Sequence, residues 1–247
     1  MTAPEQKFSG KAEIYAAFRP SYPPELTDWI SERCPHVKVA DIGAGTGIFT
    51  RCLLRRYGDV TAVEPNADMR EQFSMLLPQI RCIAASGEAT GLPDHAFGLV
   101  TVAQAFHWLN ENRFRDECRR ILRPGGRLAI IWNNRSDTGI AAERNEICRA
   151  FCPDFRSGHA GNRTEAEGDR FLREEYFSSV EVCSFRNPFP MTEERFLGDA
   201  SSRSYSLPPD HPDYRRCMDA LREVFRRHAS NGLAVEEYEA KVYLGTL

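Results

Sequence analysis

Two glycines and a distant carboxylate have the types and spacing of a nucleotide site. Residues 41–47 read Asp-Ile-Gly-Ala-Gly-Thr-Gly and follow an apolar run that begins at Val37. Gly43 and Gly45 let the backbone turn tightly and approach a ligand with no Cβ in the way. Glu64 ends the next expected strand, where a carboxylate can accept hydrogen bonds from both hydroxyls of a ribose.

The spacing and charge of this loop favour one kind of ligand. A dinucleotide fingerprint reads G-x-G-x-x-G and places pyrophosphate at a helix N-terminus. Here the spacing is G-x-G-x-G, and Asp41 comes just before it. A negative side chain so close disfavours pyrophosphate and favours a ligand with positive charge, such as a sulfonium and an α-amino group. The loop therefore predicts S-adenosylmethionine, with a nicotinamide-dependent oxidoreductase as the alternative.

The elements that must position these residues alternate along the chain. Short apolar runs rich in β-branched residues predict strands, and amphipathic patterns between them predict helices. The strands are expected at 37–42, 59–64, 79–84, 99–103 and 128–132, and the helices from 48, over 66–77 and over 111–122. Such alternation implies a parallel sheet with helices on both faces.

The second half of the chain follows a different pattern. Residues 137–175 are mostly helical and charged, with a polar stretch at 157–168. Residues 180–185 alternate as a strand does, and residues 192–229 form a helical pattern with one apolar face. Residues 239–244 predict an edge or antiparallel strand.

Composition limits the classes of protein. The chain has 247 residues, 42% of them hydrophobic, which suffices for a sizeable core. A single domain is expected, with a cap at 1–35, a cofactor-binding core at 36–132, and acceptor-side helices and final strands at 133–247. The net charge of −3 argues against a nucleic-acid partner. A small-molecule substrate is expected, and a monomer or homodimer.

Cysteine and histidine usage and the N-terminus suggest a reducing, aqueous compartment. The eight cysteines form no C-x-x-C pair and are expected to be free thiols. The six histidines show no metal-ligand spacing, so no metal site is expected. Residues 1–10 are polar and unlike a signal peptide, and no apolar run could span a bilayer. We therefore expect a cytoplasmic protein without a membrane partner.

Several segments resemble the successive motifs of class I S-adenosylmethionine-dependent methyltransferases. They are YAAFRPSYP at 15–23, DIGAGTG at 41–47, VEP at 63–65, SGEATGLPDHAFGLV at 86–100, AQAFHW at 103–108 and LRPGGRLAI at 122–130. They are similar to the small-molecule type 11 group, and within it to trans-aconitate methyltransferase-like enzymes. The resemblance implies a Rossmann-like α/β fold, with a mostly parallel seven-stranded sheet, an antiparallel last strand and helical lid insertions.

The resemblance also implies roles for the residues that match the motifs at the cofactor. Gly43 and Gly45 would pack against its methionine part. Glu64 would hold the ribose, and Met69 would cover the adenine.

Further matching residues would surround the cofactor. Glu88 and Ala89 match the loop that recognises adenine, although many relatives have Asp where this chain has Glu88. Gln104 follows the fourth strand and would lie near the transferring methyl group. Tyr15 and Arg19 would close over the cofactor, with Arg19 paired to its carboxylate.

The candidate catalytic residues follow the fourth strand. His107 would orient or deprotonate the acceptor, with a structural histidine as the alternative, and Trp108 would form a pocket wall. Trp132 and Asn133, after the next strand, are similarly placed.

The acceptor would also meet the inserted region at 192–207, because insertions between late strands of this fold often form a lid. Arg195, Arg203 and Tyr205 lie there, and an arginine could bind a substrate carboxylate. Surface solvation is the alternative interpretation of these residues.

The sequence thus predicts methyl transfer to a small molecule, with a carboxylic acid as one candidate acceptor. A catalytically silent S-adenosylmethionine-binding protein is the alternative from another class. A nucleic-acid acceptor is disfavoured, because residues 103–106 read Ala-Gln-Ala-Phe where base methylation would need an Asn/Asp-Pro-Pro-Tyr tetrad.

Overall fold

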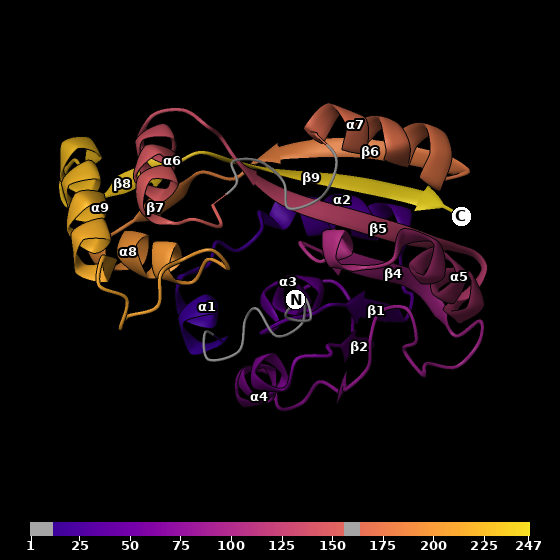
Figure 1. Ribbon diagram of the computed structural model, residues 1–247. Coiled ribbons are helices and arrows are strands. Elements are labelled where there is room, and N and C mark those ends of the chain that lie inside the picture. Colours follow the sequence, from indigo (N-terminus) through magenta and orange to yellow (C-terminus); the bar gives the residue numbers. More distant parts are fainter. Residues whose placement is uncertain (1–11, 156–163) are drawn as a thin grey trace.

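A single large sheet forms the centre of the computed structural model, which describes residues 12–155 and 164–247 (Figure 1). Its seven strands run in the order β3-β2-β1-β4-β5-β9-β6. The strands are β1 (Val39–Ile42), β2 (Val60–Val63), β3 (Cys82–Ile83), β4 (Phe97–Ala103), β5 (Leu122–Arg135), β6 (Ser179–Arg186) and β9 (Tyr238–Thr246). β9 is antiparallel to β5 and β6, and the other pairs are parallel. The predicted Rossmann-like sheet with an antiparallel last strand is therefore confirmed.

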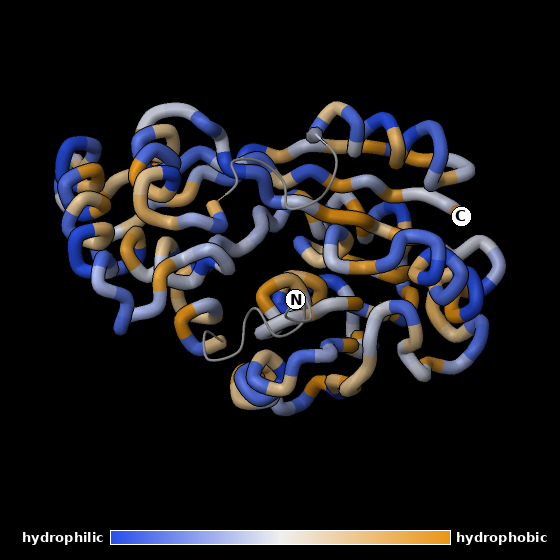
Figure 2. Tube along the Cα trace, in the orientation of Figure 1, coloured by the Kyte–Doolittle hydropathy of each residue, from blue (hydrophilic) through white to orange (hydrophobic). Residues whose placement is uncertain are grey.

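Helices cover both faces of this sheet. The helices in the described part of the chain are α1 (Ala12–Phe18), α2 (Pro24–Arg33), α3 (Ile48–Leu53), α4 (Ala67–Leu76), α5 (Glu111–Ile121), α6 (Ile140–Phe151), α7 (Glu165–Phe171), α8 (Glu193–Ser201) and α9 (Tyr214–His228). One buried cluster joins the sheet to α5 and the turn after α7, and a second joins it to α2 and α3. Figure 2 shows hydrophilic and hydrophobic segments alternating along these helices, as one-sided burial requires.

A smaller layer lies beyond the carboxyl ends of the parallel strands. It contains α6, α8, α9 and a two-stranded sheet of β7 (Phe189–Met191) and β8 (Ala234–Glu236), which share their own buried cluster (Figure 1). The continuous helix predicted for 192–229 is wrong, because α8 ends at Ser201 and α9 begins at Tyr214. Pro208 and Pro209 lie in that gap, and proline cannot continue a helix.

The structure also corrects the place or the bounds of two expected strands. The strand predicted at 239–244 is antiparallel, but it lies inside the sheet between β5 and β6 and not at its edge. The strand predicted at 79–84 is only Cys82–Ile83, at the true edge. Part of the polar stretch at 157–168 falls outside the described residues. Among the helices that the structure describes, none is long and apolar enough to cross a membrane.

Arg144 holds the smaller layer together. This side chain of α6 is only 1% exposed, and its guanidinium lies 2.8 Å from Asp199 Oδ2 and 3.1 Å from Glu236 Oε2. Asp199 belongs to α8 and Glu236 to β8, so one cation neutralises carboxylates from two other elements. A buried charge of either sign is costly without its partner.

We therefore expect Arg144→Met to destabilise the fold by about 3–5 kcal/mol, because two buried carboxylates lose a shared partner. Urea unfolding followed by circular dichroism measures this change. Arg226→Met is the matched control, since Arg226 pairs with Glu223 on the exposed face of α9 and should cost under about 0.5 kcal/mol. Equal stability of the two variants would contradict this role.

Candidate functional site

The glycine loop after β1 is anchored on the end of β2. The amides of Gly43 and Ala44 both donate to the carbonyl of Val63, at 2.8 and 3.1 Å. Gly43 and Gly45 have φ values of 65° and 57°, a left-handed conformation that favours glycine. A Cβ on Gly43 would lie 2.5 Å from the Cβ of Ala105, so the loop packs directly against the segment after β4.

Glu64 closes the other side of the loop. One carboxylate oxygen accepts from the backbone amide of Gly45 and the other from the backbone amide of Asn66, both at 2.9 Å. Burial raises the pKa of Glu64, while these two amides oppose the rise. Each carboxylate oxygen can still accept a second hydrogen bond. The carboxylate is thus fixed at the edge of the loop, in the position that the sequence predicts for a ribose-binding acid.

Asp41 is buried beneath the same loop. Its carboxylate oxygens accept from the hydroxyls of Thr50 at 2.6 Å and Thr101 at 2.8 Å. Burial raises the pKa of this carboxyl to about 6, and the two threonines hold the rise in check. Asp41 therefore joins β1 to α3 and β4, so its contact with a ligand stays a prediction.

The loop has room for a ligand. Nothing lies within 4 Å of the position that a Cβ on Gly45 would take, so a cofactor can approach the backbone there. The buried hydroxyl of Thr46 has no hydrogen-bond partner in the described part of the chain. Gly47 is the N-cap of α3, and no side chain caps this helix. The loop thus fits an adenosyl cofactor, and Met69 lies buried near the start of α4.

The predicted adenine loop is tied to the start of α5. The carboxylate of Glu88 accepts from the backbone amide of Asn110 at 2.8 Å, and Asn110 is the N-cap of α5. The amide of Ala89 donates to the carbonyl of Ser86 at 3.3 Å, which closes a tight turn. Contact of Glu88 and Ala89 with adenine stays a prediction.

Gln104 joins the ends of β4 and β5. Its backbone amide donates to the carbonyl of Ile131 at 2.9 Å, and its side-chain amide donates to the backbone carbonyl of Asn133 at 2.8 Å. Its φ of 57° is unusual for a residue with a side chain and marks a sharp turn. Gln104 therefore lies where the segment after β4 passes the glycine loop, which suits the predicted place near the methyl group.

Arg19 links α1 to the end of α8. Its guanidinium lies over the ring of Tyr15, 4.6 Å from the centroid, and donates to the hydroxyl of Ser202 at 2.8 Å. Asp199 lies 3.7 Å from the same guanidinium. Burial and the neighbouring Arg203 lower the pKa of Arg19. The predicted pairing of Arg19 with a cofactor carboxylate stays a prediction, since these contacts are all to the protein.

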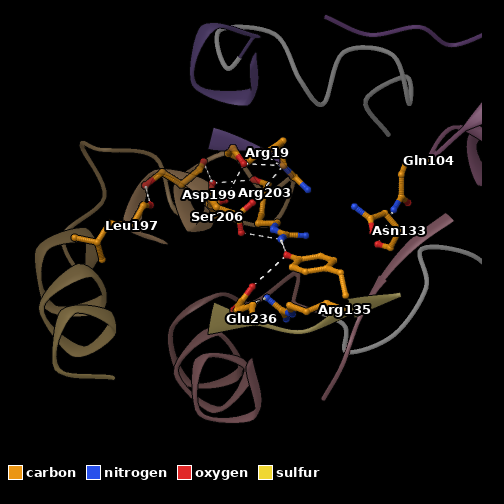
Figure 3. A network of polar contacts seen from close by, with 12 residues as sticks. Arg19, Gln104, Asn133, Arg135, Leu197, Asp199, Arg203, Ser206 and Glu236 are labelled. Carbon is orange, nitrogen blue, oxygen red and sulfur yellow. Dashed lines mark hydrogen bonds and ion pairs between the residues drawn. The ribbon is translucent and has the colours of Figure 1, made fainter. Parts of the chain in front are cut away.

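A cluster of arginines surrounds Arg19 (Figure 3). Arg203 bonds to Asp199 Oδ2 at 2.7 Å and to the Tyr238 hydroxyl at 3.0 Å. Arg135, at the end of β5, bonds to Asn145 and lies 3.8 Å from Glu236. Sequence reasoning singled out Arg19 and Arg203 but missed the other two members of this arginine cluster, which consists of Arg19, Arg135, Arg144 and Arg203. The position of Arg135, three residues beyond the strand expected at 128–132, was the available signal.

The other predicted acceptor residues divide between two places. His107 and Trp132 line a cavity of about 620 Å³, and Trp108 is not among its described lining residues. The rings of His107 and Trp108 are 4.6 Å apart. The side chain of Asn133 lies elsewhere, where it donates to the carbonyl of Ser21 at 3.3 Å.

The two remaining acceptor candidates pack within the smaller layer. The guanidinium of Arg195 lies over the ring of Phe189, 4.4 Å from its centroid. The ring of Tyr205 packs edge-on against Phe155, with their centroids 5.0 Å apart. Neither contact places these side chains beside Gln104, so their predicted role at the acceptor gains no support.

Known proteins are similar to this chain in sequence and in fold. Residues 40–130 match the family model described as a methyltransferase domain. An uncharacterized methyltransferase of Mycobacterium tuberculosis is 33% identical over 92% of this chain and 90% of its own length. A methyltransferase-like protein of Schizosaccharomyces pombe is 36% identical over 81% of this chain and 78% of its own. A solved structure of a candidate type II methyltransferase from Anaeromyxobacter dehalogenans has a TM-score of 0.70, with 24% identity over 93% of this chain and 98% of that chain, and shows the same fold.

Glu64→Gln should weaken binding of S-adenosylhomocysteine about tenfold or more, because an amide cannot accept from both backbone N–H groups and a ribose at once. Isothermal titration calorimetry measures the dissociation constant. Glu71→Gln, an exposed change on α4, is the control and should bind as the unmodified protein does. Unchanged binding by Glu64→Gln would refute the role assigned to this carboxylate.

The pKa of Asp41 predicts a pH effect on stability. An unfolded aspartate has a pKa of about 3.9, and the folded value is about 6. The folded state therefore favours the protonated form, and the free energy of unfolding falls as the pH rises from about 4 to about 6. Asp41→Asn should remove roughly 2–3 kcal/mol of this fall, measured by urea unfolding across that range. Asp59→Asn, an exposed change, should leave this pH dependence in place. A free energy of unfolding that still falls by the same amount in Asp41→Asn would contradict the assignment.

Proposed function

Because this chain belongs to the class I S-adenosylmethionine-dependent methyltransferases, we propose that it methylates a small molecule bearing a carboxylate. Family membership sets aside the nicotinamide-dependent oxidoreductase. The cavity of about 620 Å³ supports a small-molecule acceptor, since ligand sites of this kind are usually about 300–1,000 Å³. The net charge of −3 gives no support to a nucleic-acid acceptor.

The charge of the arginine cluster is the observation that supports a carboxylate. Four arginines in this cluster face two carboxylates, Asp199 and Glu236, which leaves two positive charges in excess. The side chains of Arg19 and Arg203 are 16% and 18% exposed, so they lie at the accessible side of the cluster. Two bound carboxylates would balance this excess, one from the cofactor and one from the acceptor.

The cluster lies across from the expected point of methyl transfer. Figure 3 shows Arg19, Arg203 and Arg135 together, with Gln104 and Asn133 to one side of them. An arginine can hold a carboxylate with two parallel hydrogen bonds, which fixes the orientation of the group. Arg203 is thus suited to orient the acceptor while Gln104 fixes the segment beside it.

A carboxylate acceptor suits the side chains that are present. S-adenosylmethionine supplies a methyl group already activated by its sulfonium. As the carboxylate oxygen forms its bond to the methyl carbon, the carbon–sulfur bond breaks and its electron pair stays on sulfur. An ionised carboxylate has no proton to remove, so the chain needs to align and shield the reactants but needs no general base. His107 would then contact the acceptor without acting as a base.

Turnover tests this proposal directly. The purified enzyme is incubated with S-adenosylmethionine and with acids, phenols or amines of similar size, and S-adenosylhomocysteine release is measured. We expect turnover with acids, and an ester product that releases methanol in alkali. Turnover confined to phenols or amines, with an alkali-stable product, would refute it.

Arg203→Gln should raise KM for the acid at least tenfold, because a hydrogen bond to a charged group is lost. Calorimetric binding of S-adenosylhomocysteine should stay within about twofold, since Arg19 and Arg144 still neutralise Asp199. Arg222→Gln, on the outer face of α9, is the control. An unchanged KM in a folded Arg203→Gln protein would show that this arginine does not bind the acceptor.

A further inference from the structure

The cavity beside His107 has the shape and the walls of a specificity pocket. It lies between the segment after β4, the start of α5, helix α7, and strands β5 and β9. Its lining includes Phe106, His107, Trp132, Asp169, Lys241 and Tyr243. None of these belongs to the arginine cluster, so the cavity is a separate part of the site.

Aromatic rings form the inner wall of the cavity. Trp132 packs edge-on against Phe106 and Tyr243, with ring centroids 6.0 and 5.8 Å apart. Phe171 lies 5.5 Å from Tyr176, which in turn lies 5.2 Å from Phe106. Such a wall favours a flat, apolar ligand, because ring faces and edges attract other rings beyond simple burial.

Strand β5 connects this cavity to the place of methyl transfer. Successive side chains of a strand point to opposite faces of the sheet. Trp132 and Asn134 line the cavity. The side chain of Asn133 instead donates to the carbonyl of Ser21, and Arg135 belongs to the arginine cluster. A ligand that crosses the end of β5 can therefore hold its carboxylate near Arg203 and its body in the cavity.

The far end of the cavity carries hydrogen-bonding groups. Lys241 Nζ and the Tyr243 hydroxyl both donate to Asp169 Oδ1, each at 2.7 Å. The tyrosine proton is thus directed to Asp169, and its oxygen can accept a bond from a ligand. An ammonium group has three donors, so Lys241 can donate to the same ligand atom. A hydroxyl group, which accepts one bond and donates another, matches this pair.

The charge around that end is unsuited to a second carboxylate. Asp169 is shared by Lys241 and by Arg173, whose guanidinium lies 2.7 Å from Oδ2. Glu111 and Glu165 line the same cavity. Counting these five residues, three carboxylates face two cations. The cavity thus has no positive charge in excess, in contrast to the arginine cluster.

We propose that the acceptor is an aromatic monocarboxylic acid whose ring occupies this cavity and whose distal hydroxyl binds Lys241 and Tyr243. The proposal rests on the proposed function in one respect, that the acceptor's reacting group is a carboxylate. It makes Lys241, Tyr243 and the aromatic wall the determinants of specificity, and it disfavours aliphatic polycarboxylates as substrates.

A blocked cavity tests where the ring binds. Gly168 of α7 lines the cavity, and nothing lies within 4 Å of the position that its Cβ would take. Gly168→Leu should therefore fill the cavity without disturbing the helix, while Ala166→Leu adds the same side chain at an exposed position of α7 outside the lining. We expect calorimetry on the S-adenosylhomocysteine complex to show 4-hydroxycinnamate binding weakened at least tenfold in Gly168→Leu only.

The polar end is tested by a pair of probes. The unmodified protein should bind 4-hydroxycinnamate about five- to tenfold more tightly than cinnamate, as expected for the hydrogen bonds of one hydroxyl. Lys241→Met and Tyr243→Phe should each abolish most of this ratio. Arg173→Met is the matched control, because it removes another partner of Asp169 without altering the cavity lining.

Three results would overturn this proposal. They are tighter binding of propane-1,2,3-tricarboxylate than of either cinnamate, equal binding by Gly168→Leu and Ala166→Leu, and failure of both cinnamates to bind. Because these measurements record binding and need no turnover, they stay separate from the proposed function. Cavity binding of 4-hydroxycinnamate with methylation at its phenol would refute the carboxylate acceptor and the orientation proposed here, yet would leave the cavity as the site of the ring.

Discussion

The site depends on the two hydrogen bonds that the Glu64 carboxylate accepts. It accepts from the amides of Gly45 and Asn66, and so joins the loop after β1 to the segment that enters α4. Held in this way, the loop keeps Gly45 clear of neighbouring atoms and packs Gly43 against Ala105. Cofactor loop and acceptor segment are thus positioned by one buried acid and by the parallel strands that bring their ends together.

Charge is distributed unequally around this centre. The arginine cluster carries an excess of positive charge on the side of α1 and α8, whereas the cavity beside α7 has aromatic walls and a polar end without excess positive charge. β5 lies between them, with Arg135 toward the cluster and Trp132 and Asn134 toward the cavity. An acceptor that is anionic at one end and flat at the other would match both, which is the physical basis of the specificity proposed here.

Local patterns in the sequence were enough to predict the sheet, the glycine loop and the acid at the end of β2. Each depends on neighbouring residues whose hydrophobicity or conformation is set within a few positions. The arginine cluster could not be predicted in this way, because Arg144 of α6 meets Asp199 and Glu236 from distant segments. The break between α8 and α9 was missed although Pro208 and Pro209 lie within it, since the apolar spacing on either side continues.

We propose that the loop between β1 and α3, together with Glu64, binds the methyl donor so that its methyl group faces Gln104. A crystal structure of the complex with S-adenosylhomocysteine tests this most directly. We expect the ribose hydroxyls on the Glu64 carboxylate, the homocysteine part over Gly43 and Gly45, and the sulfur on the side of Gln104. A ribose bound away from Glu64, or a sulfur directed away from Gln104, would contradict it.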